Sequence, residues 1–214
     1  MSFPIRARTI ALGAVIALTA CASNPVHYYT LVSPATSATT TATSTTARAA
    51  APLAINVLPV GIPAQLDQQQ MVVRSGTGAA RILDNERWVA PLGDELRAAL
   101  SSALVEQLGA RNVTGLPRPS NQTVMSIRTQ VRRFDAWPGS MAQFEADWVV
   151  GVQQDTPGTP GTRISCSTRL NEAAPGGYAD MVRVQQRMIE QFATRIASTV
   201  RSFGNGRPAC PADS

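Results

Sequence analysis

Three consecutive segments in the C-terminal half of the chain alternate between apolar and polar residues. They cover residues 124–134, 141–153 and 163–170, and short turns containing Pro138-Gly139 and Pro157-Gly158 separate them. Because successive side chains of a β-strand point to opposite faces, each segment has one apolar and one polar face. The pattern predicts an antiparallel meander with one face on a core and the other in solvent.

Two segments with helical periodicity can cover that apolar face. Leucine recurs at every fourth position from Leu92 to Leu108, between Pro91 and Gly109, which are typical of a helix start and a helix end. In residues 178–203 the apolar side chains also follow a helical spacing. We therefore predict an α/β (α+β) fold, a two-layer sandwich with two long helices on one face of a mixed, mostly antiparallel sheet.

The N-terminal half supplies the other predicted strands. Residues 26–32 and 53–60 are rich in β-branched and aromatic side chains, and residues 71–74 and 79–83 flank Gly76-Thr77-Gly78 as in a β-hairpin. Residues 34–52 are almost wholly Thr, Ala and Ser, a composition that predicts disorder. If strand 26–32 docks, this run is an insertion between strands; otherwise it lengthens an N-terminal tether. We favour the docked arrangement.

The first 20 residues have the layout of a secretory signal peptide. Arg6 and Arg8 precede an apolar run of about eleven residues, too short for a bilayer that needs about 20. The run ends in Leu18-Thr19-Ala20-Cys21, which resembles a bacterial lipobox with Cys21 as the acylated mature N-terminus; ordinary cleavage after Ala22 is the alternative. The usual inner-membrane retention signal is an Asp where this chain has Ala22. We therefore expect the periplasmic face of the outer membrane.

The expected organisation has five parts. These are a lipoprotein signal peptide (1–20), a lipidated N-terminus with the first strand (21–33), a disordered insertion (34–52), a single α/β domain (53–203, with strand 26–32) and a tail (204–214).

Composition and cysteine usage exclude several function classes. All 19 basic residues are arginines, and they are scattered rather than clustered, so nothing predicts nucleic-acid binding. In an oxidising compartment, Cys166 and Cys210 either form a disulfide or remain as a buried and a free thiol; we favour the disulfide. Their spacing does not suggest a metal site, and no cofactor motif occurs.

Nothing in the sequence predicts catalysis. The single histidine, His27, lies six positions after Cys21, which argues against a histidine-based triad within the domain. Metalloprotease, phosphate-loop and dinucleotide motifs are absent from the sequence. Glu145 and Asp147 could form a carboxylate pair, but a solvated strand face explains them more simply. We predict a non-enzymatic protein.

An ordered series of short motifs runs through the mature chain. After the lipobox come Tyr28-Tyr29-Thr30-Leu31, Ile62-Pro63, Leu66-Asp67, Met71-Val72-Val73-Arg74, Arg87-Trp88 and Pro91-Leu92. Their order and spacing resemble the PqiC/YmbA family, the ABC-type transport auxiliary lipoproteins of Gram-negative envelopes. The resemblance covers nearly the whole mature chain apart from the Thr-rich run and the tail. It departs from the family pattern at Gln68-Gln69-Gln70, where a basic residue and a proline are expected.

The resemblance implies a function in intermembrane transport. Members of the PqiC/YmbA family are expected to work with an MCE-domain protein, which spans the periplasm, and with the inner-membrane component of that system. The pair would move lipids or other hydrophobic molecules between membranes and support envelope integrity, and the resemblance also implies a homo-oligomer. The competing hypothesis is a monomeric periplasmic carrier lipoprotein that holds a hydrophobic ligand between helices and sheet.

The resemblance also implies a set of structural or partner-contacting residues. The matching positions are Tyr28, Tyr29, Leu31, Arg74, Arg87 and Trp88. For Tyr29, Leu31 and Trp88 the alternative is a purely structural place in the core. A polar role is expected for Arg74 and Arg87, because a buried arginine needs a carboxylate or carbonyl partner.

Overall fold

The computed structural model describes residues 24–34, 53–117, 119, 122–153 and 161–212. The predicted signal peptide, Cys21 and residues 35–52 of the Thr-rich run lie outside the described residues. The elements in chain order are β1 (His27–Tyr29), β2 (Ala54–Val57), the 3-10 helix η2 (Ala64–Leu66), β3 (Gln70–Ser75), β4 (Ala79–Trp88), α1 (Leu92–Leu108), β5 (Arg111–Asn112), β6 (Val124–Trp137), β7 (Ser140–Val152), β8 (Arg163–Ala174) and α2 (Tyr178–Gly204).

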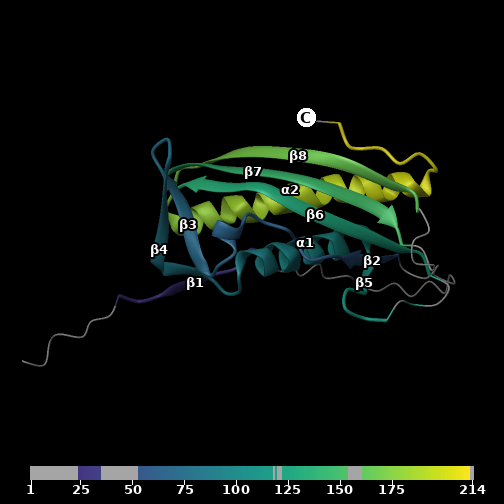
Figure 1. Ribbon diagram of the computed structural model, residues 1–214, viewed down its shortest axis with the longest axis horizontal. Helices are drawn as coiled ribbons and strands as arrows, with labels where there is room; N and C mark the ends of the chain where they lie inside the picture. Colours follow the sequence, from purple (N-terminus) through teal and green to yellow (C-terminus); the bar gives the residue numbers. More distant parts are fainter. Residues whose placement is uncertain (1–23, 35–52, 118, 120–121, 154–160, 213–214) are drawn as a thin grey trace, which may run out of the picture.

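A five-stranded sheet in the order β5-β2-β6-β7-β8 forms one layer of the molecule. Strands β6, β7 and β8 make the predicted antiparallel meander, while β2 runs parallel to both β5 and β6. The turn from β6 to β7 uses Gly139 at a φ of 80°, a conformation that side chains with a Cβ rarely adopt. Both helices cover the apolar face of this sheet, which confirms the two-layer α+β sandwich (Figure 1).

The sequence pattern predicted a single sheet, but the structure has a second one. It forms one end of the molecule (Figure 1). It has three strands in the order β1-β4-β3, and we call it the small sheet. Strand β1 covers only part of the predicted segment 26–32 and pairs in parallel with residues 86–88 of β4. The predicted hairpin is present as β3 and β4. However, β4 continues to Trp88, because β1 pairs with the half of β4 that β3 leaves largely unpaired.

A β-bulge in β6 decides which of its residues face the core. Up to Val131 the predicted alternation is confirmed, with the odd-numbered apolar residues buried. Continued strictly, it would place Asp135 in the core and Phe134 in solvent. The register shifts between Val131 and Arg133, so that Phe134 and Ala136 are buried on the helix side instead.

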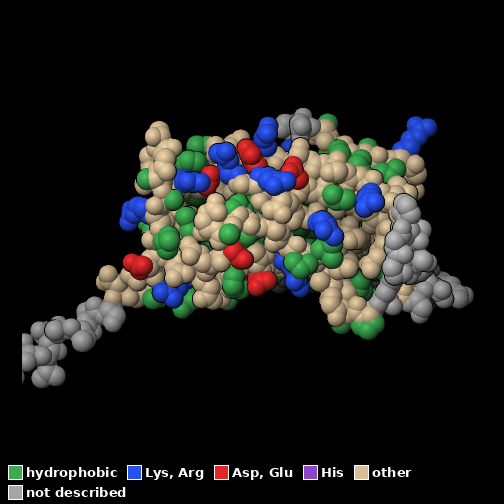
Figure 2. Space-filling view, in the orientation of Figure 1, with side chains coloured by type: hydrophobic (Ala, Val, Ile, Leu, Met, Phe, Trp, Pro, Cys, Tyr) green, Lys and Arg blue, Asp and Glu red, His purple; other side chains and the backbone are tan. Residues whose placement is uncertain are grey.

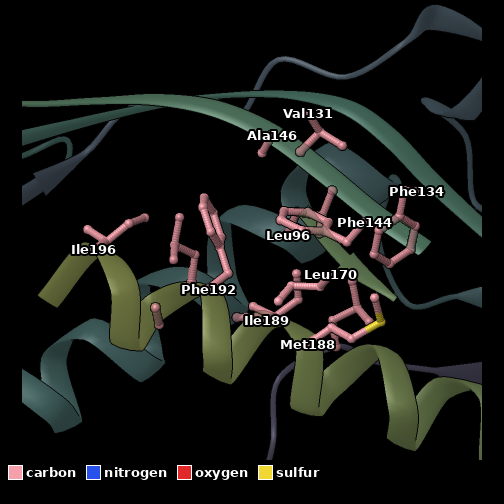
Figure 3. Close-up of a cluster of buried hydrophobic side chains, with 14 of the residues drawn as sticks. Leu96, Val131, Phe134, Phe144, Ala146, Leu170, Met188, Ile189, Phe192 and Ile196 are labelled. Carbon is pink, nitrogen blue, oxygen red and sulfur yellow. The ribbon is translucent and has the colours of Figure 1, made fainter. Parts of the chain in front are cut away.

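Aromatic rings connect the small sheet to the main core. The ring of Trp88 in β4 lies 6.4 Å from that of Phe134, which lies 6.3 Å from Phe144, which in turn lies 4.9 Å from Phe192 of α2 (centroid distances). Figure 3 shows Phe134, Phe144 and Phe192 among aliphatic side chains from both layers. The small sheet is therefore packed onto the same core as the helices.

The ends of α1 match the sequence signals. The helix begins directly after Pro91, and Gly109 ends it in the left-handed conformation, with a φ of 58°. Helix α2 ends at Gly204, one residue beyond the predicted segment. In the described part of the chain, neither helix is both long and apolar enough to cross a membrane.

The C-terminal tail folds back onto α2 and β8. Cys210 forms a disulfide with Cys166 of β8, with their Cα atoms 5.7 Å apart. Thr199 Oγ1 donates a hydrogen bond to the carbonyl of Ala209, and the Ala209 amide donates one to Ser202 Oγ. These contacts tie the tail to both the helix and the sheet edge.

Candidate functional site

Residues 27–33, which follow the predicted lipobox, dock onto the domain where the small sheet meets the two helices. We call them the docked segment. His27 pairs with Glu86 and Tyr29 with Trp88 in the parallel β1–β4 ladder. The carbonyl of Tyr29 accepts a hydrogen bond from the Val89 amide at 2.9 Å. The first part of the docked segment is thus an edge strand of the small sheet.

Helix α1 holds the next part of the docked segment through a buried carboxylate. Glu95 is 5% exposed, and its Oε2 accepts hydrogen bonds from Thr30 Oγ1 at 2.8 Å and from the Leu31 amide at 2.9 Å. The side chain of Leu31 is buried in the main core. Sequence reasoning missed Glu95; the available signal was a carboxylate next to Leu96 on the apolar face of a helix.

Helix α2 completes the attachment of the docked segment. Gln186 Nε2 donates to the carbonyl of Thr30 at 2.9 Å, and Ser33 Oγ donates to Glu190 Oε1 at 2.5 Å. Both helices and the small sheet therefore hold seven consecutive residues. The domain fixes where its N-terminal chain leaves the fold.

A cluster of titratable groups lies on the inner side of β1. His27 Nδ1 is 3.0 Å from Glu86 Oε1 at the solvent edge of the cluster. Burial, together with a hydrogen bond to Glu86 and the negative charge of that carboxylate, raises the pKa of Tyr29 to about 12. The phenol of Tyr29 therefore stays neutral near pH 7.

The structure brings together five of the six residues that the family resemblance singled out. Tyr28, Tyr29, Leu31, Arg87 and Trp88 all lie on or beside the β1–β4 pair. Leu31 and Trp88 are buried and Tyr29 is half-buried, whereas Tyr28 is exposed. Arg87 has a carbonyl partner, since its Nε donates to the backbone oxygen of Asp84 at 3.1 Å.

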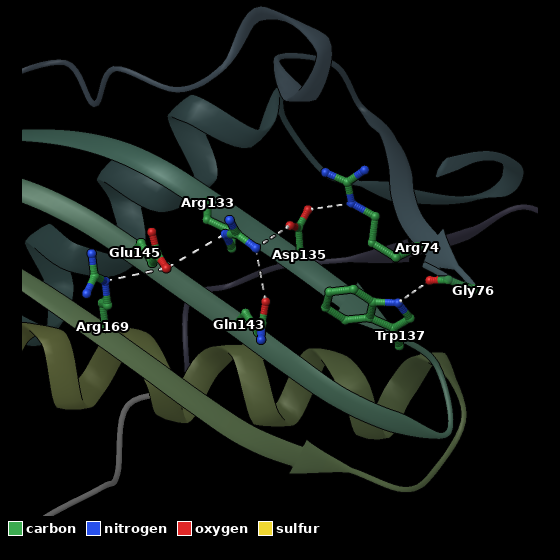
Figure 4. A network of polar contacts seen from close by, with 8 residues as sticks. All are labelled: Arg74, Gly76, Arg133, Asp135, Trp137, Gln143, Glu145 and Arg169. Carbon is green, nitrogen blue, oxygen red and sulfur yellow. Dashed lines mark hydrogen bonds and ion pairs between the residues drawn. The ribbon is translucent and has the colours of Figure 1, made fainter. Parts of the chain in front are cut away.

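The sixth residue, Arg74, joins the two sheets instead. Its Nε donates to Asp135 Oδ1 at 2.8 Å, and the Asp135 side chain is only 9% exposed. Nearby, Trp137 Nε1 donates to the carbonyl of Gly76 at 3.0 Å (Figure 4). These two bonds fix the β3–β4 hairpin against the end of β6.

The ion pair of Arg74 continues as a row of charges across the outer face of the large sheet (Figure 4). Arg133 lies 3.9 Å from Asp135 and 3.8 Å from Glu145, and Arg169 lies 3.5 Å from the same Glu145. In Figure 2, basic and acidic side chains are interspersed over strands β6 to β8. The face opposite the helices is thus polar, and ion pairs run across its strands.

The carboxylates of this face take part in ion pairs rather than in a paired acid site. Glu145 lies between Arg133 and Arg169, and Asp147 accepts a hydrogen bond from Arg132 Nε at 2.8 Å. Among the described residues, no group of three or more His, Cys, Asp or Glu side chains is placed to hold a metal ion. Glu145 and Asp147 are therefore engaged by arginines and do not form a carboxylate pair with each other.

Comparison with known proteins identifies the family. The family described as "ABC-type transport auxiliary lipoprotein component" matches residues 29–197. No curated protein matches the chain.

Two solved structures share the fold. One, an uncharacterised protein, has a TM-score of 0.61 at 21% sequence identity, over 83% of this chain and 99% of its own. The other, a Xanthomonas campestris protein of the DUF330 family, has a TM-score of 0.53 at 14% identity, over 73% and 88%. Because the family match spans well over half of the sequence, the chain belongs to the ABC-type transport auxiliary lipoproteins, the family that its motifs resemble.

Proposed function

We propose that this protein is a non-catalytic accessory lipoprotein of an MCE-type transport system, anchored by Cys21 on the periplasmic face of the outer membrane. It would receive a periplasm-spanning MCE-domain protein, whose inner-membrane component completes the system, and so support lipid movement and envelope integrity. The observation that carries the proposal is the family match over residues 29–197, which begins inside the docked segment.

The attachment of the docked segment supports a role close to a membrane. Cys21 lies six positions before His27, the first residue of β1. A fully extended chain of that length spans about 20 Å. An acyl group on Cys21 would therefore hold the small sheet within roughly that distance of the lipid headgroups, whatever the length of the Thr-rich run.

The polar outer face supports a binding role over catalysis. Its carboxylates are each matched by arginines, and His27, the single histidine, pairs with Glu86 at the edge of the small sheet. Such a surface offers paired charges and hydrogen-bonding groups to a protein partner.

The packing of the core disfavours a carrier that holds its ligand between the helices and the sheet. The cavity between helices and sheet, lined by residues such as Leu96, Phe144 and Phe192, has a volume of about 10 Å³, which is no more than the space of one water. Of the larger hollows at the surface of the described residues, the one of about 540 Å³ beside the ends of α1 and α2, lined in part by Leu53, Leu108 and Phe203, suits an apolar ligand best. Lipid extractable from the purified protein would favour that alternative.

Crosslinking in intact envelopes tests the proposal. The acylated full-length protein would be purified from gently solubilised, crosslinked envelopes and its companions identified by mass spectrometry. We expect an MCE-domain protein in amounts comparable to the bait, and much less of it with Cys21→Ala, which frees the protein from the membrane. Recovery of the bait alone, with bound lipid, would overturn the docking role and favour the carrier.

A further inference from the structure

The large apolar side chains that the structure leaves exposed gather at one end of the molecule. Val26 (40% exposed), Tyr28 (60%), Ile82 (59%) and Val89 (57%) all belong to the small sheet or lie directly beside its strands. Among the described residues only Leu116, in the loop after β5, is another exposed large apolar residue. Clustering of this kind marks an interaction surface, whereas scattered single residues do not.

The strand register places the central members of this cluster on one face. Tyr28 is opposite Arg87 in the parallel β1–β4 ladder, while the neighbouring Trp88 points to the core. The register of β3 and β4 shifts between Gln70 and Val72, and on either side of that irregularity one residue of β4 is buried, Leu83 and Trp88. Because neighbouring side chains of a strand point to opposite faces, Ile82 and Arg87 lie on the outer face of the small sheet, as does Tyr28.

Val26 directly precedes β1, and Val89 directly follows β4. We call Val26, Tyr28, Ile82, Arg87 and Val89 the small-sheet patch.

The patch combines apolar side chains with one basic side chain. Arg87 lies opposite Tyr28, with its Nε bonded to the carbonyl of Asp84. Glu86, the carboxylate next to Arg87, is turned inward to His27. Tyrosine and arginine are side chains that the headgroup region of a bilayer accommodates, because they combine apolar stems or rings with polar ends.

The chain upstream of the patch brings a lipid surface within reach. The small sheet forms an end of the molecule (Figure 1), and in the sequence Cys21 lies only six positions before His27, the first residue of β1. The reach of about 20 Å leaves this end as the part of the fold nearest to an acylated Cys21.

We propose that the small-sheet patch rests on the headgroup region of the same bilayer that holds the acyl chains of Cys21, with Arg87 among the headgroups. The proposal rests on the acylation of Cys21 given under the proposed function. This contact gives the domain a defined orientation, with the small sheet on the membrane and the C-terminal ends of α1 and α2 directed away from the membrane.

Fluorescence of the full-length acylated protein in vesicles tests this orientation. With Cys21 acylated and Cys166 bridged to Cys210, a thiol introduced by Tyr28→Cys can be labelled with an environment-sensitive dye. The vesicles would contain phosphatidylethanolamine and phosphatidylglycerol, with and without a nitroxide-bearing lipid. Leu116→Cys is the matched control, because it is an equally exposed apolar residue outside the patch.

We expect the nitroxide to quench the label at position 28 about twofold or more, with a blue-shifted emission, and to leave position 116 unaffected, since interfacial groups lie about 5–10 Å into the headgroup boundary. Equal quenching at the two positions overturns the proposal. A blue shift at position 28 without quenching also overturns it, because a second copy or another protein then covers the patch.

Mass spectrometry of the vesicle-bound protein separates this failure from failure of the proposed function. If the protein is acylated and binds vesicles but position 28 stays in water, only the proposed orientation is wrong. If Cys21 carries no acyl groups, both the orientation and the proposed anchoring by Cys21 are wrong.

Discussion

The buried carboxylate of Glu95 connects the N-terminal chain to the helical layer through two hydrogen bonds, to Thr30 Oγ1 and to the Leu31 amide. We expect Glu95→Ala to lower the free energy of unfolding by about 2–3 kcal/mol, because two donors lose a charged acceptor. It should also expose residues 27–33 to proteolysis. Denaturant titration and limited proteolysis of the purified protein measure the two effects.

Two variants on the same helix control this experiment. Glu95→Gln keeps one acceptor oxygen and should lose less stability than Glu95→Ala. Glu106→Ala removes an exposed carboxylate and should change stability by no more than about 0.5 kcal/mol. Equal losses for Glu95→Ala and Glu106→Ala would show that the carboxylate does not hold the docked segment.

Two buried threonines of the large sheet differ in whether their hydroxyl has a partner. Thr168 Oγ1 accepts a hydrogen bond from Trp148 Nε1 at 3.0 Å, whereas Thr129 Oγ1 has no partner among the described residues. Thr129→Val should therefore be neutral or stabilising. Thr168→Val should cost about 1–2 kcal/mol, because the indole N–H stays buried and unpaired. The unfolding midpoints of the two variants in denaturant measure these effects. A large loss of stability in Thr129→Val would show that the Thr129 hydroxyl does have a partner.

Tyr29 should make stability depend on pH in the alkaline range. Its pKa is about 12 in the folded protein against an ordinary value of 10.0, so the folded state binds its proton more tightly than the unfolded state. This contribution is fully present below pH 10 and is lost as the pH rises through 12. The free energy of unfolding, measured between pH 9 and 12, should fall more steeply for the wild type than for Tyr29→Phe. Parallel curves would contradict the assignment.

At the scale of elements, local periodicity predicted the parts of the fold that depend on local patterns. The meander and both helices were correct because their apolar faces are continuous in the sequence. The separate small sheet was not predicted, since β1 has three residues and its partner in β4 lies far along the chain. The Asp135 contact was also hidden, because only the bulge in β6 turns that carboxylate away from the core and toward Arg74.

The Arg74–Asp135 pair should contribute to the attachment of the small sheet. A double-mutant cycle with Arg74→Met and Asp135→Asn should give a coupling free energy of about 1.5–3 kcal/mol, since Asp135 is mostly buried and the bond is charged. The Arg132–Asp147 pair has the same 2.8 Å separation but is well exposed, and its cycle should give less than about 1 kcal/mol. Similar couplings in the two cycles would show that burial of Asp135 does not matter.

At the scale of the whole molecule, the docked segment separates two stretches of chain that would otherwise act as one tether. Residues 22–26 lie between Cys21 and β1, whereas the Thr-rich run lies between the docked segment and β2. Only the first stretch can set the distance between the domain and a bilayer that holds Cys21. The topology therefore assigns different mechanical roles to the two stretches on either side of the docked segment.

Insertion of the same Gly/Ser segment at two places tests this difference. Fifteen residues inserted after Ser23 add about 20 Å of root-mean-square reach. In a strain that lacks the native protein, we expect this variant to be acylated and folded but to fail in restoring resistance of the envelope to detergent. The same insertion within residues 35–52 should restore resistance fully, because it lies downstream of the docked segment. If the two variants restore resistance equally, the distance from membrane to domain does not matter for function, and the docked segment serves the stability of the fold alone.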